Sequence, residues 1–373
     1  MVITKTMKII LAVTLALFFV CGVALGISLT VEYLGDSGSV YLGSGGSGGG
    51  AAKDTPSVPV GDFSSGEGKQ TGIKLPCATA EGVYKSTSST SKITLTDDSV
   101  ILSKAAILVE LTGNTSIVER SADTPIHPAS LTKVMTILVA CENAKDPNAM
   151  MTVTQEMVDY HAQTGGSGSM AFVAGESISV EDALYLINYN SDTVACLLIA
   201  NYVSQNEDEF VKLMNQKAAS LGLTNTNFVN CTGLENENHK TTCREMAAIM
   251  YAAIKNETAK KIITSYNAYE PVIYKSDGTS RTELAYSSWY SVRLKDNNWA
   301  GNGSDVKIYG GKTGSEDTPS SCFVTYAQNT KTNVEYICVT IGKITSEQTN
   351  VTNSKSTEDT KKLYQLYAKT EKE

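Results

Sequence analysis

The middle of the chain carries apolar residues with the period of an α-helix. They recur at intervals of three and four residues in four ranges, 180–187, 192–203, 209–221 and 244–254. This spacing gathers the apolar side chains on one face of a helix, so the four ranges are predicted to be amphipathic helices. The range 360–368 shows the same pattern and predicts one more helix near the end of the chain.

Strand-like patterns flank this helical middle. Residues 105–111 form an apolar run before Gly113-Asn114, and residues 115–118 follow, which predicts a β-hairpin. A second group of strands is predicted in the C-terminal part, beginning with residues 306–309. Strands at both ends with helices between them indicate an α/β fold.

The C-terminal strands include a second predicted hairpin that contains two cysteines. Its strands are residues 321–326 and 334–341, around Asn329-Thr330. In that register Cys322 lies opposite Cys338, close enough for a disulfide. An exported protein permits disulfides, but buried free thiols are the expected state of the cysteines, and a Cys322–Cys338 disulfide is the alternative.

The N-terminal segment predicts export. Residues 9–31 contain no charged residue and are nearly all apolar, a length that spans a bilayer. Lysines precede this segment and Glu32 follows it, so the positive-inside rule leaves residues 1–8 in the cytoplasm and places the rest outside. We expect a retained transmembrane anchor at the cell membrane. A signal peptide cleaved near residues 24–26 is the alternative, and it would give a secreted protein.

Residues 32–73 have the composition of a flexible linker. Gly and Ser dominate residues 35–50, and polar low-complexity sequence continues to about Thr71. A Gly-rich coil of this length spans roughly 30–35 Å, which would hold the remainder of the chain close to the membrane. Residues 74–373 are predicted to form the catalytic domain.

Composition and charge exclude several classes of function. The net charge is -8 and the lysines are scattered, so the basic surface typical of nucleic-acid binding is missing. The eight cysteines match no zinc-ligand spacing, and neither a metal nor an organic cofactor is expected. The three histidines, His127, His161 and His239, are assigned structural hydrogen bonds rather than chemistry.

Ser130 and Lys133 are the strongest candidates for catalysis. Pro128 suits the first turn of a helix and the apolar residues after it keep helical spacing, which places Ser130 near a helix N-terminus. Residues three apart share a helix face, so the Lys133 amine is expected to accept the Ser130 hydroxyl proton. The amine must be neutral for this role. Burial and a second cation, for which Lys312 in YGGKTG is the candidate, would lower its pKa.

The order Ser-x-x-Lys, then a strand ending in Lys-Thr-Gly, resembles the low-molecular-mass penicillin-binding proteins. These are serine D-alanyl-D-alanine carboxypeptidases related to serine β-lactamases. The resemblance covers about residues 105–342 and includes AAILVE, PASLTKVMT, AGESISVEDALYLI, LMNQKAASLGLTNTNFVNCTGL, HKTTCREMAAI and GGKTG. It implies a β-lactamase/transpeptidase-like fold, an antiparallel sheet flanked by helices with a mainly helical subdomain.

The resemblance also implies a role for each matched residue. Ser130 would carry the acyl-ester and Lys133 would accept its proton. Lys312 and Thr313 would bind the terminal carboxylate of the substrate. The backbone N–H groups of Ser130 and Ser315 would form the oxyanion hole.

The third motif of the family, Ser-x-Asn, falls at Tyr189-Asn190-Ser191 and departs from the pattern. Tyr189 takes the serine position, where its hydroxyl would pass a proton to the leaving amine. Ser191 replaces the asparagine and offers no amide group, which weakens hydrogen bonding to the substrate unless Asn190 turns inward. The departure is expected to affect the rate of turnover more than the class of reaction.

The function implied is removal of the terminal D-alanine from peptidoglycan stem peptides that end in D-Ala-D-Ala, with β-lactams as inhibitors. Two alternatives stay open. A β-lactamase would share the nucleophile, but no convincing Glu-x-x-x-Asn element is present to activate water. A catalytically weak sensor of penicillin or wall peptide would agree with the altered third motif.

Overall fold

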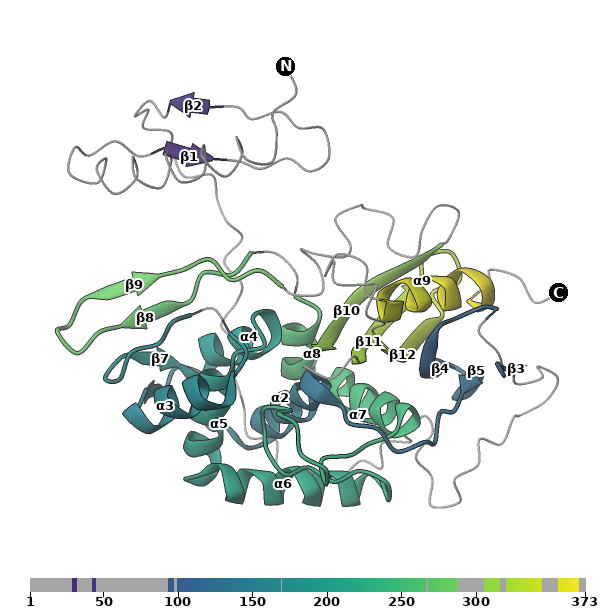
Figure 1. The fold of residues 1–373 in the computed structure, drawn as a ribbon, viewed down its shortest axis with the longest axis horizontal. Coiled ribbons are helices and arrows are strands. Elements are labelled where there is room, and N and C mark those ends of the chain that lie inside the picture. Colours follow the sequence, from purple (N-terminus) through teal and green to yellow (C-terminus); the bar gives the residue numbers. More distant parts are fainter. Residues whose placement is uncertain are drawn as a thin grey trace, which may run out of the picture. The chain divides into compact units, whose positions relative to one another are not determined.

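The structure is a computed structural model that describes residues 29–31, 42–44, 93–96, 99–168, 170–265, 268–287, 305–315, 320–343 and 355–368 (Figure 1). The chain divides into two compact units, Met1–Val60 and Gly61–Glu373. The boundary between the units falls inside the predicted linker. In the first unit β1 (Leu29–Val31) pairs antiparallel with β2 (Leu42–Ser44), a pairing that the linker prediction did not include.

The predicted transmembrane segment lies outside the described residues except for its last three positions. Within the described part of the chain, no helix combines the length and the apolar composition that crossing a bilayer requires. The anchor and its cleaved alternative therefore stay predictions.

The second unit is built on a six-stranded sheet. Its strand order is β10 (Val306–Ser315), β11 (Ser320–Asn329), β12 (Glu335–Lys343), β4 (Ser103–Glu110), β5 (Thr115–Arg120) and β3 (Ile93–Thr94). Neighbouring strands are antiparallel except β5 and β3. Both predicted hairpins are confirmed, as β4–β5 and β11–β12. β10 continues beyond the predicted residues 306–309, so the Lys-Thr-Gly motif lies on the strand itself.

Alternation along the strands gives the sheet two apolar faces. Ile107 and Val109 belong to the large core that includes α7 (Cys243–Lys255). Leu108, between them, belongs to a smaller core that includes the C-terminal helix α9 (Lys355–Tyr367). The sheet is therefore covered by helices on both faces (Figure 1).

The remaining helices form the mainly helical subdomain that the family resemblance implied. They are the short 3-10 helix η1 (Ala129–Leu131), then α2 (Thr132–Asn143), α3 (Gln155–Thr164), α4 (Val180–Tyr189), α5 (Thr193–Ser204), α6 (Glu207–Ser220) and α8 (Glu257–Ile263). The four predicted central helices are confirmed as α4 to α7. Each of α3 to α8 begins after a side chain that accepts a backbone N–H from three residues further on. These capping residues are Thr154, Ser179, Asp192, Asn206, Thr242 and Asn256.

A second, four-stranded sheet lies in the helical part. Its order is β6 (Met150–Thr152), β7 (Ser177–Ser179), β8 (Val272–Tyr274) and β9 (Ser280–Thr282). The Arg281 Nε lies 2.7 Å from a carboxylate oxygen of Glu176, which ties β9 to the segment before β7. This sheet was not predicted from the sequence, because three-residue strands are too short to show an alternating pattern.

The alternative of a disulfide between Cys322 and Cys338 is contradicted, and the expected buried free thiols are confirmed. In the β11–β12 ladder Cys322 pairs with Ile341, and Cys338 pairs with Thr325. The two strands pair around a turn that lies further along the chain than Asn329-Thr330, and the shift in register moves the thiols to opposite faces of the sheet. Cys322 lies in the core that includes α7, and Cys338 lies in the core that includes α9. Both are buried free thiols.

Candidate active site

Ser130 lies in the short helix η1, directly before α2. The preceding residue, Ala129, has a φ of +48°, a strained conformation for a residue with a side chain. Glycine backbones approach this turn from two other segments. A Cβ added to Gly233 would lie 2.1 Å from the Ala129 carbonyl oxygen, and one added to Gly314 would lie 3.2 Å from the Ser130 nitrogen. The turn is therefore held by close backbone contacts that only glycine permits at Gly233.

Lys133 contacts the Ser130 hydroxyl, as the sequence analysis predicted. The distance from Lys133 Nζ to Ser130 Oγ is 3.1 Å, and the amine also bonds the Thr232 carbonyl oxygen. Lys133 is only 1% exposed, and burial lowers its pKa. Burial is the largest cause of this shift, and the influence of a Lys312 cation stays a prediction. A buried amine with neutral partners is suited to accept a proton.

The Thr232 carbonyl is positioned by the side chain of Asn230. Asn230 Oδ1 accepts hydrogen bonds from the Gly233 N–H at 2.7 Å and from the Thr232 N–H at 3.2 Å. These bonds orient the loop so that its carbonyl points at the Lys133 amine. Thr232 was not among the predicted site residues, although it lies in NCTGL, which is part of the family-like sequence.

Lys312 connects the Lys-Thr-Gly strand to the third motif. Its Nζ lies 3.1 Å from Ser191 Oγ and 3.0 Å from the Thr313 carbonyl oxygen, and Lys312 is 1% exposed. Ser191 has a φ of +58°, which turns the chain between α4 and α5. Two residues after Lys312, Gly314 packs against the Ser130 nitrogen. The Ser130–Lys133 and Lys312–Ser191 pairs therefore belong to one site.

Thr313 and Ser315, which were predicted to contact the substrate, lie after Lys312 on β10. Thr313 is half-buried and pairs with Phe323 in the sheet. Ser315 ends β10 opposite Ser321. Carboxylate binding by Thr313 and the oxyanion hole at Ser130 and Ser315 stay predictions.

Tyr189 lies differently from what the motif predicted. Its ring packs near Tyr185 and Tyr269, with ring centroids 6.2 and 6.0 Å away. Its hydroxyl bonds Ser265, and burial raises its pKa. Tyr189 is the last residue of α4 and lies on the buried side of that helix, whereas the turn at Ser191 faces β10. Ser191 therefore makes the contact with Lys312 that joins this motif to the site.

Two histidines support the segment around Ser130. His127 Nδ1 accepts a hydrogen bond from the Ala129 N–H at 3.2 Å, and His239 Nε2 bonds Thr132 Oγ1 at 2.8 Å. Burial lowers the pKa of His239 to about 3, so this imidazole is neutral at physiological pH. These contacts match the structural roles predicted for His127 and His239.

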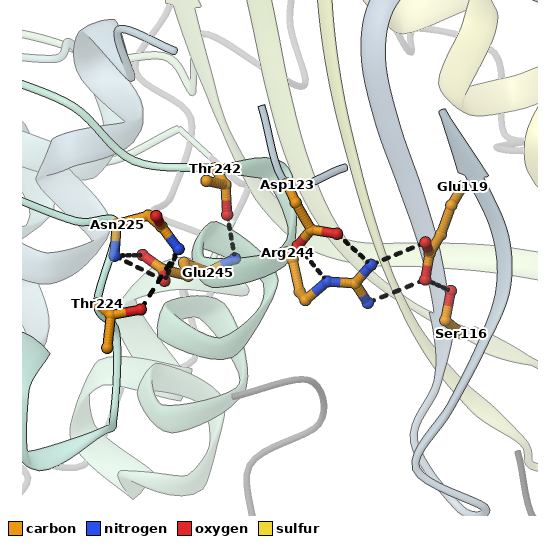
Figure 2. Close-up of polar contacts among 8 residues, drawn as sticks. All are labelled: Ser116, Glu119, Asp123, Thr224, Asn225, Thr242, Arg244 and Glu245. Atoms are coloured by element: carbon orange, nitrogen blue, oxygen red, sulfur yellow. Dashed lines mark hydrogen bonds and ion pairs between the residues drawn. The ribbon is translucent and has the colours of Figure 1, made fainter. Parts of the chain in front are cut away.

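A network of charged side chains fastens α7 to the sheet (Figure 2). Arg244, in the first turn of α7, lies 2.7 Å from Glu119 on β5 and 2.5 Å from Asp123. Glu245 beside it accepts hydrogen bonds from the Asn225 backbone and side chain. Just before α7, Thr241 pairs with Ile126 in the segment that leads to Ser130. The network therefore anchors the framework around the site without contacting the Ser130 hydroxyl.

Solved structures of DD-peptidases have the same fold. The crystal structure of the Streptomyces K15 DD-transpeptidase is similar at a TM-score of 0.62 and 21% identity, over 72% of this chain and 97% of that one. The D-alanyl-D-alanine carboxypeptidase from Mycobacterium tuberculosis is similar at a TM-score of 0.58 and 20% identity, over 74% and 92%. The predicted fold class, an antiparallel sheet flanked by helices, is confirmed.

The sequence matches the D-alanyl-D-alanine carboxypeptidase family over residues 91–345, and the chain belongs to that family. Its relatives include D-alanyl-D-alanine carboxypeptidase DacF of Bacillus subtilis, 33% identical over 166 residues, 44% of this chain and 42% of that protein. DacC of Escherichia coli is 31% identical over 209 residues, 54% of this chain and 52% of that protein. The matched region thus spans about half the length of these relatives.

Proposed function

We propose that the protein is a serine-type D-Ala-D-Ala carboxypeptidase that removes the terminal D-alanine of peptidoglycan stem peptides through an acyl-enzyme on Ser130. The observation that carries this proposal is the buried Lys133 amine, 3.1 Å from the Ser130 hydroxyl and bonded only to neutral oxygens among the described residues. A lysine in that setting can take the proton of an alcohol that is otherwise a poor nucleophile at neutral pH. Membership of the carboxypeptidase family supports the choice of substrate.

In the acylation step, Ser130 Oγ attacks the carbonyl carbon between the two D-alanines while its proton passes to Lys133. The negative charge on the carbonyl oxygen is stabilised by the N–H groups of Ser130 and Ser315. The C–N bond then breaks, and the departing amine takes the proton from Lys133, with the Ser191 hydroxyl as the relay. The products are free D-alanine and an ester on Ser130.

Substrate binding relies on the carboxylate of the terminal D-alanine. The ammonium group of Lys312 and the hydroxyl of Thr313 are matched to that charge. In the second half of the reaction water attacks the ester, Lys133 accepts a proton from the water, and Ser130 regains its hydroxyl. A β-lactam presents a similar carboxylate and a reactive amide, so it is expected to acylate Ser130.

The decisive test is release of D-alanine from a pentapeptide ending in D-Ala-D-Ala, with Ser130→Ala as the matched control. We expect release by the parent protein and a loss of at least about a thousandfold in the variant. Labelling by a fluorescent penicillin is expected to follow the same pattern. A parent protein that neither releases D-alanine nor takes the label would contradict the proposal.

The same assays separate the two alternatives. Penicillin labelling without release of D-alanine would identify a penicillin-binding sensor, the outcome that the altered third motif makes worth testing. Rapid hydrolysis of a chromogenic cephalosporin, faster than cleavage of the peptide, would identify a β-lactamase.

We further propose that the enzyme acts on the outer side of the cell membrane, attached by residues 9–31. The uncharged apolar run and the lysines before it support this topology. In intact cells that express the full chain, externally added protease is expected to degrade the catalytic domain. Protection of that domain in intact cells would contradict the proposed location.

A further inference from the structure

His127 bonds the backbone of the turn that carries Ser130. Its Nδ1 accepts a hydrogen bond from the Ala129 N–H at 3.2 Å. Ala129 is 0% exposed and has a φ of +48°, so this turn is strained and its surroundings must hold it in place. Ala129 directly precedes Ser130, whose N–H and hydroxyl both take part in the proposed mechanism. The bond to His127 therefore acts on the residue next to the nucleophile.

The rest of the fold fixes both sides of this arrangement. Ile126 pairs with Thr241 through two backbone hydrogen bonds of 2.8 and 2.9 Å, which anchors the chain directly before His127. Beyond the ring, a Cβ on Gly233 would lie 2.1 Å from the Ala129 carbonyl oxygen, so that carbonyl is closely packed. The Ala129 N–H therefore cannot rotate toward water without disturbing contacts that hold the Ser130 turn.

The direction of this hydrogen bond fixes the position of the proton on the neutral imidazole. A backbone N–H can only donate, so Nδ1 of His127 must present a lone pair and the ring proton must be on Nε2. Protonation of the ring adds an N–H at Nδ1 that faces the N–H of Ala129. Two donors then repel each other, and the Ala129 N–H is left buried without an acceptor.

The groups around His127 determine where it titrates. The side chain is half-buried, so part of its surface is exposed to protons from water. Burial lowers its pKa, and the Leu234 carbonyl and the Glu235 carboxylate oppose that lowering. The His239 ring lies next to it, with centroids 5.3 Å apart, and interacts electrostatically with Lys133. Because the pKa of His239 is about 3, that ring stays neutral while His127 gains its proton.

We infer that His127 is a positioning residue that holds the Ser130 turn in its reactive arrangement while the imidazole is neutral, and that its protonation in mild acid slows acylation. The inference rests on the proposed function, because it assumes that Ser130 is acylated. It adds a residue outside the three sequence motifs, and it gives the enzyme a second source of pH dependence besides the Lys133 amine.

The test compares acylation by fluorescent penicillin in the full-length parent, in His127→Asn and in His127→Phe, from about pH 8 to about pH 5. Asparagine offers an oxygen that accepts a backbone N–H two residues further on, and it does not titrate. Phenylalanine keeps a ring but offers no acceptor. The acylation rate is expressed per folded protein, with the folded fraction measured at each pH by circular dichroism.

His127→Asn is expected to acylate within about threefold of the parent near pH 8, because the Ala129 N–H keeps an acceptor. His127→Phe is expected to be roughly tenfold slower, since that N–H loses its partner. As the pH falls to about 5, the parent should lose roughly tenfold relative to His127→Asn. Titration of Lys133 lowers all three rates together, so it cancels from these ratios.

Parallel pH profiles for the parent and His127→Asn would overturn the inference. Equal rates for the two folded variants at every pH would do the same, because the acceptor atom would then have no effect on the turn. Failure of His127→Asn to fold would also overturn it, since an acceptor alone would not replace the imidazole. If His127→Phe does not fold, the comparison of the parent with His127→Asn still decides.

Nitrogen NMR of the histidine side chains gives a readout that does not depend on activity. The His127 signals are identified by their absence from His127→Asn. Near pH 8 the ring proton is expected on Nε2, and a proton on Nδ1 would overturn the inference. A parent protein that takes no penicillin label at any pH contradicts the proposed function instead, and the position of the ring proton then decides the contact between His127 and Ala129 by itself.

Discussion

Arg244 and Lys133 are both buried basic residues in the first turn of a helix, yet their partners differ. Arg244 is 6% exposed and lies 2.7 Å from Glu119 and 2.5 Å from Asp123 (Figure 2). Lys133 is 1% exposed and bonds a hydroxyl and a carbonyl oxygen. Carboxylate partners balance the charge of a buried cation, which then stabilises the fold. A buried amine whose partners are neutral tends to lose its proton.

The chemistry of the two side chains reinforces this difference. A guanidinium stays protonated in proteins and binds carboxylates through two parallel hydrogen bonds, as Arg244 does with Glu119. A lysine changes its pKa readily when it is buried, which is what the Ser130 hydroxyl requires of its neighbour. Similar burial therefore produces a structural clamp in one region and a candidate base in the other.

Replacing Lys133 by Met is expected to have the largest effect. Acylation by fluorescent penicillin should fall by about a thousandfold or more, because the proton acceptor is lost. The unfolding free energy should stay the same or rise, since an apolar chain of similar length replaces a buried amine. Lys240→Met, at an exposed position, is the matched control. Parent-like labelling in Lys133→Met would remove the base from the proposed mechanism.

Replacing Arg244 by Met should show the opposite pattern. The unfolding free energy, measured by urea titration, is expected to fall by about 3–5 kcal/mol because Glu119 is left buried without its countercharge. The folded fraction should still take the penicillin label. Adding Glu119→Leu is expected to restore most of the stability, and a double variant that is weaker than Arg244→Met would contradict this account of the clamp.

His239 extends the comparison to a second buried base with neutral partners. Its folded-state pKa is lowered to about 3, whereas an unfolded histidine titrates near 6.5. Below pH 6.5 the unfolded state gains a proton that the folded state does not bind, so stability falls as pH falls. The loss is expected to reach about 2 kcal/mol between pH 6.5 and pH 5. Unfolding measured across this range in the parent and in His239→Asn checks it, since the variant should lose this slope.

Tyr189→Phe is expected to have the smallest effect. The lost hydroxyl bonds Ser265, so the unfolding free energy should fall by about 1 kcal/mol. Penicillin labelling should change by less than about threefold. A drop of about a hundredfold would instead support the proton-transfer role that the motif alignment suggested. Ser191→Ala, which removes the contact to Lys312, is the comparison variant and is expected to reduce labelling more.

Local sequence patterns were sufficient to predict most of the longer helices and strands of the second unit. The hairpin of β4 and β5 and the helices α4 to α7 follow from runs long enough to show a period of 2 or 3.6 residues. The three-residue strands β6 to β9 carry no such pattern, and the pairing of β7 with β8 joins Ser177 to Tyr274, far apart in the chain. The predicted pairing of Cys322 with Cys338 failed because the observed register differs by three positions, and an odd shift exchanges the two faces of a strand.

The sequence by itself determined the Ser130–Lys133 contact, because three residues along a helix bring two side chains to the same face whatever the surroundings. It also determined the family, through motifs whose order is readable in the chain. The tertiary structure alone decided that Ser191 rather than Tyr189 meets Lys312. That contact depends on how the turn between α4 and α5 packs against β10. Burial and charge interactions at that scale are properties of the folded core, which no single segment encodes.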